Sequence, residues 1–156
     1  MKRALALLAL TALATPADAA VPFDAESLRG VTRFHVLVGS VTKDAEELGL
    51  SEKVLRTDVE DRFRKAGLPV DSEKVEPHFF ILVQVIKVRD GAFVVSTYME
   101  FKQNVRVVVN GAEGPGITWR NLSFSSVSSL ERLRRFVSDD LDGFITAFLK
   151  ANPPSR

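Results

Sequence analysis

The chain has 156 residues, no cysteine, and 21 basic against 20 acidic side chains, and 46% of its residues are hydrophobic. This length supports one domain with a sizeable core but not two independent domains. The near-neutral charge gives no general attraction to nucleic acid or anionic lipid, and the lack of cysteine excludes disulfides and a thiol that could carry a lipid.

Residues 1–19 have the pattern of a secretory signal peptide. Lys2 and Arg3 give a positive start, an apolar run follows, and small residues at alternate positions lead up to Ala19. We predict cleavage after Ala19 and a single α+β domain over residues 20–156. Cleavage removes two basic residues and one acidic residue, so the basic and acidic side chains then balance. The protein is therefore expected to be periplasmic or secreted, with no stable membrane anchor after cleavage.

The first half of the domain predicts a strand followed by an amphipathic helix. Residues 33–41 alternate apolar side chains in the manner of a strand. Residues 52–66 place apolar side chains three or four positions apart, Ser51 is a suitable N-cap, and Gly67 supplies a stop. A short extended piece over 68–70 is expected to follow this helix.

Two long apolar runs, 79–88 and 93–109, predict the β-hairpin around which the fold is organised. The first run is apolar at both parities near its start, which is typical of a central strand. The Asp-Gly pair between the runs predicts a type I′ turn. The second run alternates, which puts one face on the core and the other in water. The side chains expected inside are Phe93, Val95, Thr97, Met99, Phe101, Val105, Val107 and Val109, and those expected outside are Ser96, Tyr98, Glu100, Lys102, Asn104 and Arg106.

The last part of the chain predicts a loop over 110–116, a strand over 117–127 and a long helix over 129–151. Ser128, with a glutamate three residues later, predicts a capping box at the start of this helix. Gly143 lies inside the helix, where glycine is unfavourable, so we expect it to mark a close approach to a strand. The order of elements predicts an α+β fold: a two-layer sandwich with a mostly antiparallel sheet of four to five strands and two helices packed on one face.

Residues for catalysis or metal binding are sparse. His35 and His78 are the only histidines, and no glycine-flanked serine of the nucleophile-elbow kind occurs, so no catalytic residue is predicted. The common zinc motifs are missing. Asp139, Asp140 and Asp142 lie within the predicted helix and are interpreted as a solvated face. The three-glycine loop lacks the Lys-Ser or Lys-Thr of a phosphate loop, so no cofactor is predicted.

The polar face of the hairpin is the best candidate for a binding site. Tyr98 and Arg106 on the second run, with Trp119 or Arg120 on the following strand, are residue types enriched at interface hot spots. An RNA-binding sheet would mix aromatic and basic residues in the same way, but Glu100 lies among them and the chain is expected to be exported, so nucleic acid is not predicted. A solvated face without a partner remains the alternative.

Three segments carry a resemblance to known proteins. They are Leu28–Val31 (LRGV), Leu48–Glu60 (LGLSEKVLRTDVE) and Lys65–Val70 (KAGLPV). Together they resemble a group of small secreted bacterial proteins with no assigned activity, which implies no catalytic residues. The order of elements is also similar to the α/β domain of the TolB N-terminal part and of curli-assembly and penicillin-binding-protein activator lipoproteins, although this chain lacks their lipidated cysteine. That likeness implies protein binding.

We therefore expect a non-enzymatic exported protein of the bacterial envelope that binds another envelope protein through an exposed sheet face or an edge strand. The alternative is a small-molecule-binding protein or an enzyme with a pocket between the sheet and the helices. A flat face with ordered aromatics would favour the first hypothesis, and a cavity with converging polar groups would favour the second.

Overall fold

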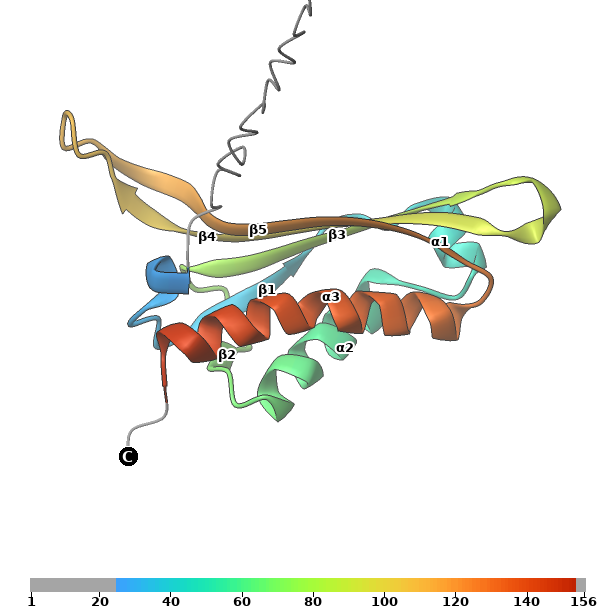
Figure 1. The fold of residues 1–156 in the computed structure, drawn as a ribbon, viewed down its shortest axis with the longest axis horizontal. Coiled ribbons are helices and arrows are strands. Elements are labelled where there is room, and N and C mark those ends of the chain that lie inside the picture. Colours follow the sequence, from blue (N-terminus) through green and yellow to red (C-terminus); the bar gives the residue numbers. More distant parts are fainter. Residues whose placement is uncertain (1–24, 154–156) are drawn as a thin grey trace, which may run out of the picture.

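The computed structural model describes residues 25–153, and the predicted signal peptide, residues 1–19, lies outside the described residues (Figure 1). An α+β domain is observed, as expected, with short helical segments over residues 25–28 and 43–47 that the sequence did not predict. In chain order the elements are the 3-10 helix η1 (Ala25–Leu28), β1 (Phe34–Val38), α1 (Lys43–Glu47), α2 (Glu52–Lys65), β2 (Val70–Asp71), β3 (His78–Lys87), the 3-10 turn η2 (Arg89–Gly91), β4 (Phe93–Arg106), β5 (Glu113–Val127) and α3 (Leu130–Ala151).

The five strands form one mixed sheet in the order β2-β1-β3-β4-β5. β1 runs parallel to both β2 and β3, whereas β3, β4 and β5 are antiparallel neighbours. The long strands are therefore the antiparallel ones, and β3 is the central strand that its apolar pattern predicted. Figure 1 shows α2 and α3 on the same side of the sheet. No helix of the described residues is long and apolar enough to cross a membrane.

A cluster of phenylalanines fills the space between the sheet and the two long helices. The Phe34 ring on β1 lies 5.8 Å from the Phe63 ring on α2 and 5.5 Å from the Phe101 ring on β4, measured between centroids. Phe144 on α3 lies 4.7 Å from Phe79 on β3. All five side chains are fully buried. Edge-to-face and tilted pairs of this kind add to the free energy of burial.

The helix starts are fixed by serine caps, one of them a residue away from its predicted position. The Ser51 hydroxyl accepts from the Val54 N–H at 3.2 Å, which confirms the predicted cap of α2. At α3 the cap is Ser129, whose hydroxyl accepts from the Arg132 N–H at 3.3 Å. The capping box predicted at Ser128 is wrong, because the helix begins one residue later.

The turn between β3 and β4 differs from the predicted type I′ turn. The Val88 N–H donates to the Ala92 carbonyl at 2.9 Å, which leaves three residues, Arg89 to Gly91, in the loop. Gly91 has φ +75°, in the left-handed region that glycine adopts readily. A helical turn closed by a left-handed glycine is the usual form of a three-residue hairpin loop, so glycine is needed here but for a different geometry.

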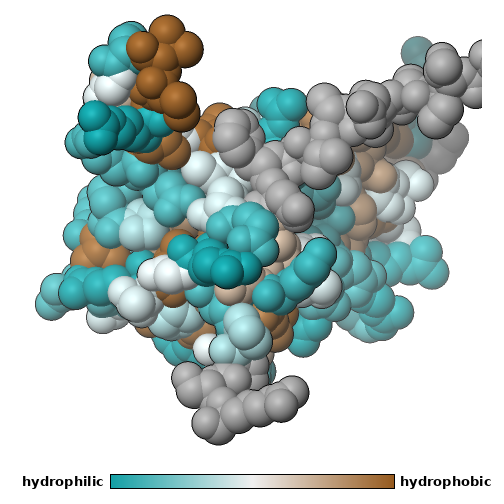
Figure 2. Space-filling model, turned by 60° about the vertical axis from the view of Figure 1, so that its left-hand side comes forward, coloured by the Kyte–Doolittle hydropathy of each residue, from teal (hydrophilic) through white to brown (hydrophobic). Residues whose placement is uncertain are grey.

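The end of the β4–β5 hairpin leaves the sandwich. Its pairing shifts register between Phe101 and Lys102, and the far part rises away from the helix layer (Figure 1). Val107 and Val109, predicted to face the core, are exposed because no helix lies beneath them. Val108 between them is 97% exposed, and Figure 2 shows apolar residues gathered at this tip. The alternation of apolar side chains in the sequence therefore continues beyond the part of the hairpin that packs on the helix layer.

Candidate functional site

The sheet face opposite α2 and α3, called the outer face below, is not covered by any helix of the described residues (Figure 1). Side chains on this face lie in cross-strand rows over β3, β4 and β5, because residues paired in an antiparallel sheet point to the same side. The rows are Phe80, Glu100 and Arg120; Leu82, Tyr98 and Leu122; Gln84, Ser96 and Phe124; and Ile86, Val94 and Ser126.

Apolar side chains on the outer face are unusually exposed. Phe124 is 68% exposed, Ile86 60%, Leu122 56% and Val94 41%. A solvated antiparallel face normally carries polar residues at such positions. None of these four residues was predicted as a binding residue, although Leu122 and Phe124 share the parity of Arg120 and alternate with small polar residues. That parity was the signal that could have found them.

A buried carboxylate lies at one end of this face. Glu100 is only 3% exposed, although the sequence placed it in water. Its Oε2 accepts from the Tyr98 hydroxyl at 2.7 Å, and its Oε1 forms an ion pair with Lys102. The Lys102 ammonium also lies 5.5 Å from the centre of the Phe80 ring. Charged groups are buried only when paired, and Glu100 meets this condition through its contacts with Tyr98 and Lys102.

The contact between Glu100 and Tyr98 also changes the pKa of the tyrosine. Its hydrogen bond to Glu100 raises the pKa of the phenol above its ordinary value, and partial burial and the carboxylate charge act in the same direction. Arg120, the cross-strand neighbour of Glu100, acts weakly the other way. The Tyr98 hydroxyl is thus held protonated and donating, which fixes the ring on the outer face.

The four predicted binding residues do not form one cluster. Tyr98 and Arg120 do lie on the outer face, where Tyr98 is two residues from Glu100 along β4 and Arg120 is the partner of Glu100 on β5. Trp119 does not: its ring lies 5.0 Å from Phe144 on the helix side, because its strand partner is the inward-facing Phe101. Of the two alternatives on this strand, Arg120 therefore shares the outer face with Tyr98 and Trp119 does not.

Arg106, the remaining predicted residue, lies at the end of the β4–β5 hairpin. Eight residues of extended strand, roughly 26 Å, separate it from Tyr98. Its partner in the register is Glu113, the first residue of β5. Arg106 therefore belongs with the exposed tip and not with the rows of the outer face.

The aspartates of α3 are less solvated than the sequence predicted. Asp140 accepts a hydrogen bond from the buried Thr97 of β4, and Asp142 forms an ion pair with Arg62 of α2. Asp139 is exposed as predicted. Among residues 25–153 no group of three or more histidine, cysteine or acidic side chains is arranged to hold a metal ion.

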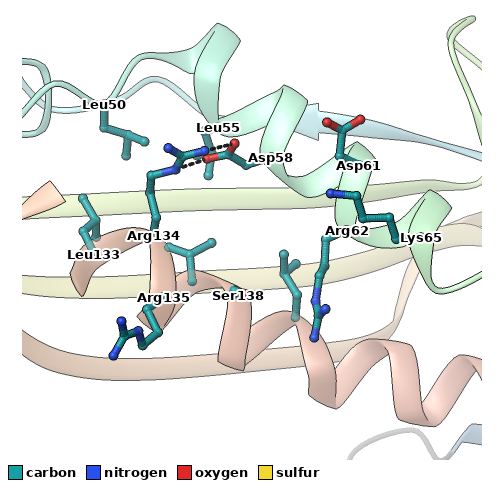
Figure 3. Close-up of a pocket in the computed structure, with 12 residues that line it drawn as sticks. Leu50, Leu55, Asp58, Asp61, Arg62, Lys65, Leu133, Arg134, Arg135 and Ser138 are labelled. Atoms are coloured by element: carbon teal, nitrogen blue, oxygen red, sulfur yellow. Dashed lines mark hydrogen bonds and ion pairs between the residues drawn. The ribbon is translucent and has the colours of Figure 1, made fainter. Parts of the chain in front are cut away.

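A pocket of about 440 Å³ lies between α2 and α3, within the helix layer (Figure 3). It does not lie between the sheet and the helices, where the alternative hypothesis expected a pocket. Arg134 at one side makes a two-pronged contact with Asp58, with N–O distances of 2.7 and 2.5 Å. The apolar lining residues are Leu50, Leu55, Leu133, Val137 and Leu141, and the charged ones are Asp58, Asp61, Arg62, Lys65, Arg134 and Arg135.

Most cations of this pocket already have carboxylate partners. Arg134 pairs with Asp58, Arg62 with Asp142, and Arg135 with Glu131. The first two pairs join α2 to α3, so they hold the helices together across the opening. An anionic ligand would have to compete with these carboxylates.

No protein-family model matches the sequence, and no curated protein matches it. Among solved structures, a point variant of the PelC dodecamer from Paraburkholderia phytofirmans overlaps with a TM-score of 0.38 at 17% identity, over 77% of this chain and 85% of that one. A protein named as a lipoprotein from Caulobacter crescentus CB15 overlaps with a TM-score of 0.41 at 12% identity, over 84% and 98%. A minor lipoprotein from Acinetobacter baumannii gives 0.31 and 14%, over 78% and 94%. Values this low assign no function, and the likeness to TolB stays a prediction.

Proposed function

We propose that the chain is a non-enzymatic exported protein of the bacterial envelope that binds another exported protein through the outer face. The observation that carries this proposal is the set of exposed apolar side chains Ile86, Val94, Leu122 and Phe124 on a face that no helix of residues 25–153 covers (Figure 1). Contiguous exposed apolar surface on a soluble domain is typical of interaction sites. Export rests on the signal-peptide pattern of residues 1–19.

The charges on the face indicate the chemistry of the partner. Glu100 is buried and paired with Lys102, so its negative charge does not face a partner. Arg120 in the same row is exposed. A matching partner presents an apolar patch bordered by a carboxylate that meets Arg120, because opposite potentials fix the register of an interface.

A small-molecule function would use the pocket between α2 and α3. Its volume of about 440 Å³ suits a small ligand. However, three of its four cations are held by carboxylates, so an anionic ligand would have to displace these carboxylates. The outer face is therefore the better supported site, and binding of a small molecule in the helix pocket is the second candidate.

Site-specific photo-crosslinking in the exporting cell tests the proposal. A crosslinking amino acid at Val94 reports on the outer face, and one at Leu149 is a matched control because the two side chains are 41% and 39% exposed. Leu149 lies on α3, in the helix layer. We expect a discrete adduct with one exported protein from position 94 and none from position 149. Equal adducts at both positions, or none at either, would contradict the proposal.

A further inference from the structure

We propose that β5 pairs with β5 of a second copy of this chain, antiparallel about a twofold axis, so that the two five-stranded sheets join edge to edge. This inference goes beyond the proposed function, because it uses the backbone of an edge strand and needs no other protein. It rests on the direction of the free backbone groups and on a self-complementary register.

The two edges of the sheet are protected very differently. The β2 edge is only two residues long, whereas β5 has 15 residues. Edge strands are usually kept from pairing by shortness, proline, charge or cover. In β5, Pro115 and the Ser27 hydroxyl, which donates to the Thr118 carbonyl at 2.8 Å, protect only the first part. From residue 120 to residue 127 the strand has no proline and one charge, and within residues 25–153 only β4 pairs with it.

The open backbone groups can be assigned from the register. Along an antiparallel strand, both backbone groups of one residue point to one side and those of the next residue to the other. The Thr118 carbonyl points away from β4, because it accepts from Ser27. The turn between β3 and β4 leads to the same assignment. The Ala92 carbonyl accepts from the Val88 N–H on the β3 side, so the backbone groups of Phe93 and of every second residue after it point toward β5. Their partners on β5 are the odd-numbered residues, whose backbone groups therefore point toward β4. The open edge therefore carries the backbone groups of Arg120, Leu122, Phe124 and Ser126.

One antiparallel register between the two copies of β5 pairs apolar side chains with each other and keeps like charges apart. With Ser123 on the twofold axis opposite its own copy, Leu122 faces Phe124 of the second copy, and Phe124 faces its Leu122. Each exposed apolar side chain thus gains an apolar cross-strand neighbour on the outer face. Arg120, the only charge in the segment, faces Ser126, so no like charges meet. Four residue pairs of this kind form about eight backbone hydrogen bonds.

Disulfide trapping tests this register directly, because the chain has no cysteine of its own. In the proposed dimer the two copies of residue 123 form a non-hydrogen-bonded pair with Cα atoms about 4.5 Å apart, which a disulfide can span. Ser125, on the same strand face, is the matched control, because its two copies lie about 14 Å apart. We expect the purified S123C protein to form a disulfide-linked dimer under mild oxidation and S125C to stay monomeric.

Sedimentation of the cysteine-free protein provides a second readout that does not depend on oxidation. We expect the unmodified chain to sediment at twice its own mass, and L122K, which places an ammonium opposite Phe124 of the second copy, to sediment as a monomer with an unchanged circular dichroism spectrum. A dimer from S125C but not S123C, equal trapping of both, trapping of neither, or a monomeric unmodified chain would each overturn the proposal.

Discussion

Removal of the Tyr98 hydroxyl tests the hydrogen bond that Tyr98 donates to the buried Glu100 on the outer face. Tyr98→Phe deletes the donor of the 2.7 Å hydrogen bond to Glu100 and leaves the ring in place. Hydrogen bonds to charged groups contribute about 1.5 to 3 kcal/mol. Lys102 still pairs with Glu100, and the half-buried phenol is partly solvated, so we take the lower end, about 1.5 kcal/mol. With a urea m-value of about 2 kcal/mol/M, the unfolding midpoint should fall by roughly 0.7 M.

The alkaline titration of Tyr98 gives an independent reading of the same contact. Tyr98 is the only tyrosine in the chain, so the absorbance of tyrosinate reports on it alone. The bond to Glu100 raises the pKa of Tyr98, and Glu100→Gln should therefore lower this pKa towards its ordinary value near 10.

The sign of the pH dependence follows from this raised pKa. The unfolded chain releases the phenol proton near pH 10, and the folded chain releases it at higher pH. The stability difference between the unmodified protein and Tyr98→Phe is thus fully present below about pH 10 and is lost as the pH rises through the folded pKa. An unchanged pKa of Tyr98 in Glu100→Gln, together with a stability loss below about 0.5 kcal/mol in Tyr98→Phe, would show that Tyr98 does not donate a stabilising bond to Glu100.

Three further substitutions test other parts of the structure. Gly143→Ala should raise the free energy of unfolding by about 1 kcal/mol in urea denaturation, because the added Cβ meets nothing within 4 Å; a loss would show an unseen contact. A double-mutant cycle of Asp58→Ala and Arg134→Ala should give a coupling of about 0.5 to 1 kcal/mol that shrinks at high salt, since both groups are partly exposed; a salt-independent coupling would argue against an ion pair. Phe34→Ala should cost about 3 to 5 kcal/mol in thermal or urea unfolding, and a cost under about 1 kcal/mol would mean that the aromatic cluster is not the core.

Local patterns predicted the elements that depend on neighbours in sequence. The Ser51 cap and the spacing of Leu55, Val59 and Phe63 gave α2 almost to the residue, because a helix is stabilised by contacts three and four positions away. The apolar run of β3 correctly indicated a central strand. The Gly143 prediction was wrong, because glycine is unfavourable in a helix whether or not a strand lies close, and here the position is exposed.

The missed features depend on contacts between distant segments. Trp119 turned inward because its side is set by pairing with Phe101, and the register shift next to this pair cannot be read from one strand alone. Glu100 was expected in water because it shares the polar parity of its strand. Its burial depends on the contacts of its carboxylate with Tyr98 and Lys102, which the alternation of the strand does not show. The pocket between α2 and α3 depends on pairs such as Asp58 with Arg134, which are 76 residues apart.

If the outer face binds a protein partner, the affinity of the partner captured at Val94 depends on the apolar side chains of this face. Replacing Ile86 and Val94 together by threonine keeps strand propensity but removes about half of two exposed apolar side chains, which should cost about 1 to 2 kcal/mol of binding. We predict a Kd raised roughly 5- to 30-fold by titration calorimetry, with Leu149→Gln, the control on α3, unchanged. Equal effects of the two variants, or no effect of either, would show that the partner does not bind through the outer face.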